Sequence, residues 1–163
     1  MGRARKILMR GGIVLTAAMM MASVSATSAE AATGRAVTGP VVGSAPFDVA
    51  SCSPIHQVYE GSITTPGGVV AQLDVDVCVA FDSTNCTATG TFSIVEGSGK
   101  VKGAATGTID CFTTKRKVPF DFTLEVQKST HHLAKVGQDL HFRGKWQSDM
   151  ESGGPFTGKV SLT

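Results

Sequence analysis

The sequence lacks the short motifs that mark common enzyme and metal sites. No two cysteines have the C-x-x-C spacing of a zinc site, and neither a nucleophile elbow nor a Ser-His-Asp order can be found. No stretch of about ten residues beyond residue 31 has the periodicity of an amphipathic helix. We therefore predict no catalytic residue, no metal and no cofactor, and a fold built from strands.

Long hydrophobic runs are also missing. Residues 11–24 are apolar and uncharged, but this run is short for a membrane span. Small residues at Ala29 and Ala31 occupy the positions that a signal peptidase reads. We expect residues 1–31 to be a cleaved secretory signal peptide and the mature protein to be secreted and extracellular, without membrane association; an uncleaved N-terminal anchor is the alternative. The run follows a basic cluster of Arg3, Arg5, Lys6 and Arg10.

The mature part of the chain has no excess of positive charge. Four of the 15 Lys and Arg residues and one of the 13 Asp and Glu residues lie in residues 1–31, which leaves 11 basic and 12 acidic residues and a net charge of −1. We therefore expect no nucleic-acid partner. Residues 115–117 (Lys-Arg-Lys) are predicted to lie in a loop away from Lys100 and Lys102, so these basic residues do not form one patch.

What the sequence does have is strand periodicity. In residues 73–81, Leu-Asp-Val-Asp-Val-Cys-Val-Ala-Phe, apolar side chains alternate with others almost without interruption. Similar alternation continues to the end, and residues 51–163 are predicted to form a single β domain. Residues 32–50 are predicted to be a flexible N-terminal arm or an irregular strand, and whether they add an eighth strand is left open. A helical turn is most favoured at residues 129–135.

Residues 90–107, GTFSIVEGSGKVKGAATG, predict a β-hairpin. A two-residue turn at residues 98–99 places large residues opposite small ones on one face and pairs threonines on the other. Glycine is expected on the inner face because a large neighbour covers it and because a bare backbone lets the sheet bend. The predicted pairs are Cys86–Cys111, Ala88–Ile109, Phe92–Ala105, Ile94–Gly103, Thr91–Thr106 and Thr89–Thr108.

The same reasoning extends to the neighbouring strands. A loop at residues 82–85 places Phe81 opposite Cys86, and a loop at residues 114–117 places Phe120 opposite Cys111. A slip by one residue would bury polar side chains, so the register is well specified. We predict an all-β fold, an antiparallel up-and-down meander of about seven to eight strands closing into a small barrel. A two-sheet β-sandwich is the alternative.

The four cysteines all lie beyond residue 31, and an even number in an exported chain predicts two disulfides. Cys86 and Cys111 share the inner face, whereas Cys78 points outward. We therefore predict the disulfide Cys86–Cys111 and, by elimination, Cys52–Cys78, which would tie the N-terminal arm to the outer face.

Residues 97–107, which follow a Thr-Gly-Thr-Phe strand, resemble small exported β-proteins of Gram-positive bacteria, most of them uncharacterised. More faintly, they resemble the G-x-G…G-A-x-G hairpin of the allene oxide cyclase and dirigent barrels. The resemblance covers this hairpin alone and implies a barrel. It implies no activity, because the acidic catalytic motifs of those families have no counterpart here.

Three groups of polar residues are candidates for chemistry. His131, His132 and His141, with Asp139, could bind a metal, but adjacent histidines on a strand point to opposite faces and we favour solvated side chains. Two aspartates of residues 73–81 share a face at about 7 Å, a separation comparable to that of a glycosidase pair, but threonines rather than an apolar pocket surround them. The possible binding surface consists of Asp74, Asp76, Thr89, Thr91, Thr106 and Thr108.

We predict a secreted, non-catalytic binding or interaction protein of unknown ligand, acting through the barrel mouth or the threonine face. The partners considered are a small apolar ligand, a carbohydrate and another extracellular protein. The alternative is an extracellular enzyme whose site cannot be read from the sequence. A pocket holding two or more of His131, His132, His141, Asp139 and Asp149 would favour the enzyme. A hollow barrel interior would favour carriage of a ligand, and a filled interior would favour recognition at the surface.

Overall fold

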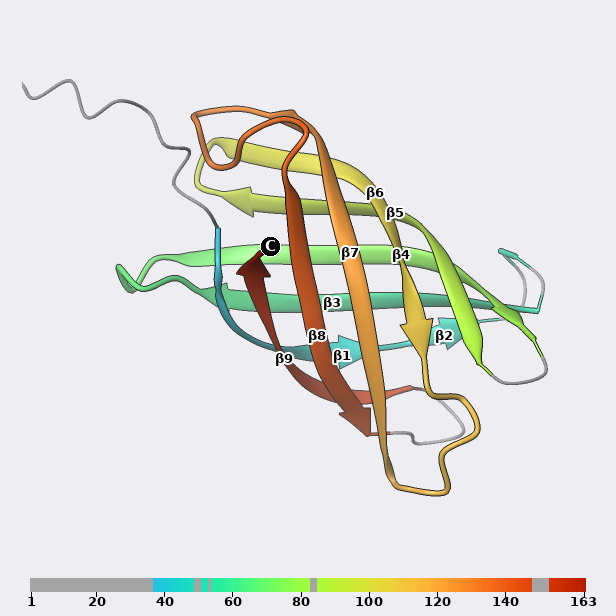
Figure 1. Ribbon diagram of the computed structural model, residues 1–163. Coiled ribbons are helices and arrows are strands. Elements are labelled where there is room, and N and C mark those ends of the chain that lie inside the picture. The colour runs from blue at the N-terminus through green and yellow to red at the C-terminus, as the bar shows by residue number, and fades with distance from the viewer. Residues whose placement is uncertain (1–36, 49–50, 53, 83–84, 148–152) are drawn as a thin grey trace, which may run out of the picture.

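Nine strands make up most of the described part of the chain, which contains no helix (Figure 1). The structure, a computed structural model, describes residues 37–48, 51–52, 54–82, 85–147 and 153–163. None of these residues forms an apolar helix long enough to cross a membrane. The strands are β1 (Gly39–Ala45), β2 (Phe47–Asp48), β3 (Ile55–Thr64), β4 (Val70–Phe81), β5 (Cys86–Glu96), β6 (Gly99–Ile109), β7 (Lys117–Ser129), β8 (Asp139–Gln147) and β9 (Gly154–Leu162).

The described strands form a closed antiparallel barrel of eight strands with one short strand added to it. From β3 to β9 each strand pairs with the next one in the chain, and β1 lies between β9 and β3 and pairs with both (Figure 1). The short strand β2 pairs with the beginning of β3. A closed ring leaves no long unpaired edge. The predicted barrel is confirmed, and the sandwich alternative is wrong.

Residues 39–45 form the eighth barrel strand. The side chains of Val41 and Ala45 are buried, and they alternate with exposed Val42 and Ser44. Because β1 pairs with a strand on each side, residues 39–45 of the segment 32–50 belong to the barrel wall. The predicted signal peptide lies outside the described residues.

The alternation in residues 73–81 forms most of β4, in which burial changes with almost every residue. The predicted register with β5 is confirmed, since Phe81 pairs with Cys86 and Val75 with Phe92. Because side chains alternate between faces with period two, a slip by one residue would move the aspartates of β4 into the interior.

The predicted register between β5 and β6 is wrong by two residues. The turn lies one position earlier than predicted, at residues 97–98, so that Phe92 pairs with Gly103 instead of Ala105. Gly97 has a φ of 58°, as the first central position of a type II′ turn requires, and glycine adopts this conformation at no steric cost. A shift of two residues leaves every side chain on its predicted face, but large opposite small is kept at Phe92–Gly103 and lost at Ile94–Val101 and Ala88–Gly107.

Position 103 requires glycine because β7 approaches it closely. A Cβ atom on Gly103 would lie 1.8 Å from the backbone carbonyl oxygen of Glu125. The register between β6 and β7 shifts at this point, between Lys102 and Gly103, as in a β-bulge. Glycine therefore lets the wall bend, as predicted, and the large residue paired with it is Phe92 rather than Ile94.

The predicted loop at residues 114–117 and the register between β6 and β7 are also wrong. β6 ends at Ile109, which pairs with Phe120, and the connection to β7 spans residues 110–116. The chain leaves the strand because Thr113 N–H donates to the carbonyl of Asp110, at 3.3 Å, in a turn. Cys111 therefore lies in the connection and not opposite Phe120. The shift is again two residues, and the inner face is unchanged.

The favoured helical turn at residues 129–135 is wrong as well. β7 continues to Ser129, and residues 130–138 form a connection of non-helical turns. His131 and His132 both have a φ of 54° there, a left-handed conformation that does not propagate a right-handed helix.

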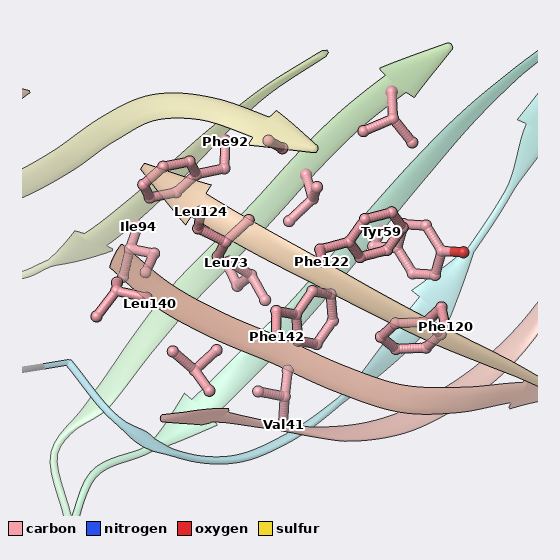
Figure 2. Packing of buried hydrophobic residues seen from close by; sticks show 14 of the residues in the cluster. Val41, Tyr59, Leu73, Phe92, Ile94, Phe120, Phe122, Leu124, Leu140 and Phe142 are labelled. Atoms are coloured by element: carbon pink, nitrogen blue, oxygen red, sulfur yellow. The ribbon is translucent and has the colours of Figure 1, made fainter. Parts of the chain in front are cut away.

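Aromatic side chains fill the centre of the barrel. Figure 2 shows Tyr59, Phe120, Phe122 and Phe142 gathered between the strands. The ring centroid of Tyr59 lies 4.8–6.0 Å from those of these phenylalanines and of Phe156, as in packed aromatic pairs. We call these five residues the aromatic cluster, and each is at most 3% exposed. The filled centre leaves the ends of the barrel as the places where a ligand could lie.

Both predicted disulfides, Cys52–Cys78 and Cys86–Cys111, are confirmed. The first ties the segment before β3 to the outer face of β4, and the second joins the start of β5 to the connection after β6. The bonded cysteines are 26 and 25 residues apart. Closing a loop of that length contributes about 3 kcal/mol through the entropy of the unfolded chain. Both bonds lie toward the end of the barrel at which β3, β5, β7 and β9 begin, which we call the mouth.

Candidate functional site

An open, mainly apolar pocket of about 500 Å³ lies at the mouth. Side chains from the mouth ends of five barrel strands line it, together with Phe47 of β2 and residues of the connection 110–116. We call it the mouth pocket. Its apolar wall includes Ile55, Val79, Phe81, Ile109, Val118 and Trp146.

The aromatic cluster lies further into the barrel than the residues that line the mouth pocket. Tyr59 follows Gln57 by two residues on β3, and Phe120 follows Val118 by two residues on β7, so these two cluster residues share a face with a pocket residue and lie further into the barrel. Phe81 is predicted to face inward, and it lies on the inner face of β4. It is nevertheless 51% exposed because it lies at the rim of the barrel.

Two buried N–H groups at the mouth pocket have no hydrogen-bond partner among the described residues. They are Nε2 of Gln57, which is 4% exposed, and Nε1 of Trp146, which is 9% exposed. The other amide atom of Gln57, Oε1, accepts a hydrogen bond of 3.2 Å from the Tyr59 hydroxyl. Burial raises the pKa of Tyr59 well above its ordinary value, so the hydroxyl keeps the proton that it donates. Most buried polar groups are paired, and these two donors are exceptions.

The charged residues that line the mouth pocket, among those the structure describes, are Lys115 and Arg116. Both are exposed and belong to the connection between β6 and β7. Lys100 and Lys102 lie at the other end of β6, next to the turn at residues 97–98, and Lys102 lines a different hollow. The pocket is therefore apolar inside with a positive rim.

A second hollow, of about 430 Å³, lies on the outer face of the barrel and is polar. Asp74, Asp76 and Thr91 line it opposite Lys102 and Lys128, and we call it the outer groove. Burial raises the pKa of Asp74 above its ordinary value of 3.8; the charges of Glu60 and Asp76 act in the same direction and that of Lys100 opposes them. The two aspartates therefore share one groove with basic residues.

The predicted threonine surface occupies one face but does not converge on one hollow. Thr89 pairs with Thr106, which pairs with Thr123 of β7, so three hydroxyls form a row across the wall. Thr108 belongs to the next row, opposite Thr87. Of the six predicted binding residues, Asp74, Asp76 and Thr91 line the outer groove, whereas Thr89, Thr106 and Thr108 do not.

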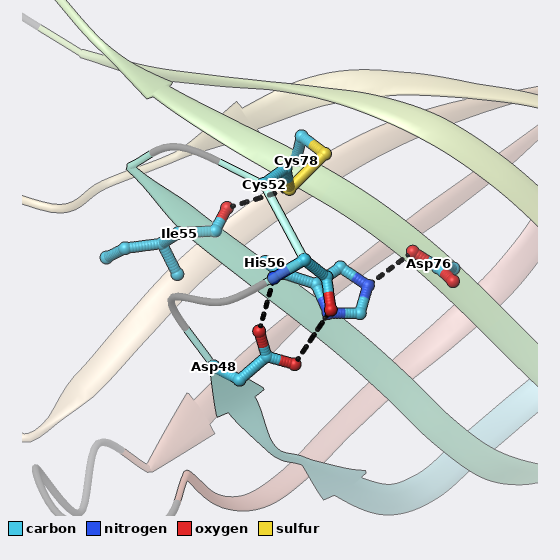
Figure 3. A network of polar contacts seen from close by, with 7 residues as sticks. Asp48, Cys52, Ile55, His56, Asp76 and Cys78 are labelled. Carbon is cyan, nitrogen blue, oxygen red and sulfur yellow. Dashed lines mark hydrogen bonds and ion pairs between the residues drawn. A yellow bond between two sulfur atoms is a disulfide. The ribbon is translucent and has the colours of Figure 1, made fainter.

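His56 links β2, β3 and β4 near the mouth (Figure 3). Its Nδ1 lies 2.9 Å from Asp48 Oδ2 and its Nε2 2.6 Å from Asp76 Oδ1. Hydrogen bonds to Asp48 and then to Asp76 raise the pKa of His56 above 6.5, against the opposing effect of burial. The disulfide Cys52–Cys78 lies beside this cluster, since Cys78 pairs with His56 across β3 and β4.

The predicted histidine cluster does not assemble. His131 and His132 are exposed in the connection between β7 and β8, and His141 lies on β8 with its Nδ1 3.8 Å from Asp121. Neither the mouth pocket nor the outer groove is lined by any of these histidines or by Asp139. Within the described ranges no group of three or more His, Cys, Asp or Glu residues could hold a metal ion. Asp149 lies outside those ranges.

Sequence reasoning missed Gln57, Trp146 and the rim cations as members of one pocket. One signal existed: Gln57 stands between Ile55 and Tyr59 at an inward position, where an amide is out of place on an apolar face. No signal existed for His56, because its partner Asp48 belongs to β2 and its partner Asp76 to β4, and only folding brings the three together.

Comparisons with known proteins are negative at all three levels: no protein-family model, no curated protein and no solved structure matches the chain.

Proposed function

We propose that the chain is a secreted, non-catalytic binding protein that holds a small, largely apolar ligand in the mouth pocket. The observation that carries this proposal is an apolar pocket of about 500 Å³ above a filled barrel centre. Its volume falls in the range of roughly 300–1,000 Å³ that small-molecule sites occupy. The mouths of β-barrels are among the places where such sites commonly occur.

Secretion is part of the proposal. The two disulfides are compatible with an extracellular protein, because such bonds persist in oxidising compartments. The predicted signal peptide at residues 1–31 supports the same location. The resemblance of the hairpin to exported β-proteins of Gram-positive bacteria stays a prediction.

The composition of the mouth pocket favours binding over catalysis. Its described charged residues are Lys115 and Arg116, and its described lining includes neither a carboxylate nor a histidine. General acid–base chemistry uses groups of those two kinds most often. Turnover of a ligand bound in the mouth pocket would support the enzyme alternative instead.

The threonine face with the outer groove is the second candidate surface, with a carbohydrate as its partner. The row of Thr89, Thr106 and Thr123 favours it, because regularly spaced hydroxyls suit a polar, ordered ligand. We place it second because exposed hydroxyls are satisfied by water, whereas the mouth pocket contains buried donors that have no partner among the described residues.

The chain offers a built-in reporter for the test. Trp146 is its only tryptophan and lines the mouth pocket, so tryptophan fluorescence reads this site directly. The neutral apolar dye Nile red should bind saturably, gain emission and change the Trp146 signal. Phe81→Ser removes an exposed pocket side chain and should weaken binding about tenfold through lost apolar contact.

Val42→Ser is the matched control. Val42 is 61% exposed, a figure similar to that of Phe81, but it lies on the outer face of β1. We expect this variant to bind the dye as the wild type does. Absence of saturable binding, or equal weakening by both variants, would refute the proposal.

A further inference from the structure

The unpaired polar groups of the mouth pocket are hydrogen-bond donors. Gln57 Nε2 and Trp146 Nε1 are buried donors without a partner among the described residues, and neither atom can accept a hydrogen bond. The Gln57 amide cannot turn its oxygen toward the pocket without cost, because Oε1 already accepts the hydroxyl of buried Tyr59. The unpaired polar atoms of these two lining side chains are therefore both N–H donors.

The side chains at the rim of the pocket are also hydrogen-bond donors, and two of them are positively charged. Lys115 and Arg116 carry only donors and are positively charged, and the hydroxyls of Thr113 and Thr114 beside them donate as well as accept. No carboxylate among the described lining residues offsets the two cations. An occupant with donors or positive charge of its own would leave the N–H groups unpaired and would be repelled at the rim.

Building on the proposed function, we infer that the mouth pocket selects a small apolar acid. The apolar body of this ligand lies against Phe81, Ile109 and Val118. Its anionic group is neutralised by Lys115 and Arg116 at the rim, and its oxygen atoms accept hydrogen bonds from the donors of the pocket. Charge-assisted hydrogen bonds of this kind are shorter and stronger than neutral ones. The head group of a ligand therefore determines how tightly the pocket binds it.

The test compares three ligands with the same ten-carbon body: decanoate, 1-decanol and decylamine. They carry an anionic acceptor, a neutral head and a cationic donor, respectively, and calorimetry or Trp146 fluorescence gives the three dissociation constants. We expect decanoate to bind tightest and decylamine weakest, with a difference of about tenfold or more between them because opposite and like charges meet the same rim.

A pair of charge reversals isolates the rim. Lys115→Glu/Arg116→Glu should abolish the preference for decanoate while 1-decanol binds as before, because the apolar wall is intact. Lys100→Glu/Lys135→Glu changes the net charge equally at the far end of the barrel and should leave the preference unchanged. Rising salt should weaken decanoate binding more than 1-decanol binding, since ions screen the exposed cations.

The outcomes separate this inference from the proposed function. Equal binding of the three ligands would overturn the selectivity for acids and leave ligand binding in place. Failure of all three to bind would refute the proposed function itself. Binding to phosphatidylglycerol vesicles that the rim reversals abolish, without binding of free decanoate, would assign the rim to a membrane surface and also overturn the inference.

Discussion

A single residue on the outer face, His56, links three strands at the mouth end of the barrel. His56 is only 15% exposed and stands between two carboxylates that belong to different strands. It can donate to both only when each ring nitrogen carries a proton, so the arrangement favours the imidazolium form. The protonation of this one side chain therefore affects how firmly β2 is held to β3 and β4.

The stability of the protein should depend on pH through His56. Because its pKa is raised in the folded protein, its contribution is fully present below the unfolded value of 6.5 and is lost as pH rises through the folded pKa. We expect the midpoint of urea unfolding to fall as pH rises from below 6.5 through the folded pKa of His56, and to fall less in His56→Gln. Parallel curves for the two proteins would show that the cluster does not couple to folding.

At the scale of elements, turns and close backbone contacts decide which strand positions pair. The β5–β6 hairpin turns at Gly97, where a positive φ is required. Strand β6 bends at Gly103, where β7 leaves no room for a side chain. Neither glycine contributes a side-chain contact. Both act by permitting a backbone path that a larger residue would block.

Gly103→Ala should destabilise the barrel by about 1–3 kcal/mol, since the added methyl group meets a backbone oxygen that cannot move aside alone. Ala104→Ser is the control, because residue 104 is on the opposite face of the same strand. Thermal unfolding followed by circular dichroism measures both. Equal melting temperatures for wild type and Gly103→Ala would mean that β6 and β7 separate freely at this point.

At the scale of the whole molecule, β1 converts a seven-strand meander into a closed wall. It pairs with β9 and β3, the last and first strands of that meander, which are otherwise its two open edges. Long-range pairing of this kind is established only when distant parts of the chain meet. Closure also places β3 and β8, which contribute Gln57 and Trp146, around the same mouth pocket.

A buried charge in β1 should open the barrel at this seam. Val41 is 1% exposed, and Val41→Asp should cost more than about 3 kcal/mol because the carboxylate has no partner inside. Amide hydrogen exchange should accelerate in β3 and β9 before it does in β5 and β6. Val42→Asp, on the exposed side of the same strand, should leave exchange unchanged, and uniform acceleration in all strands would argue against a local seam.

Much of the architecture follows from the sequence because period two is a local property. The alternation in residues 73–81 and its continuation determined which face each side chain occupies, and hence the barrel and both disulfides. The inner phase of Cys86 and the outer phase of Cys78 were enough to assign the pairs, since a disulfide cannot cross the wall. The resemblance to known hairpins added nothing that this alternation did not already indicate.

Tertiary structure alone decided the registers beyond β4–β5, the place of β1 and the site. A shift of two residues keeps every side chain on its face, so alternation cannot detect it, and the turn at Gly97 and the early end of β6 chose between the alternatives. The mouth pocket needed Gln57, Trp146 and Lys115 to meet across strands far apart in the chain. Which face a residue occupies is decided by its neighbours along the chain, but which residues share a pocket is decided by closure of the barrel.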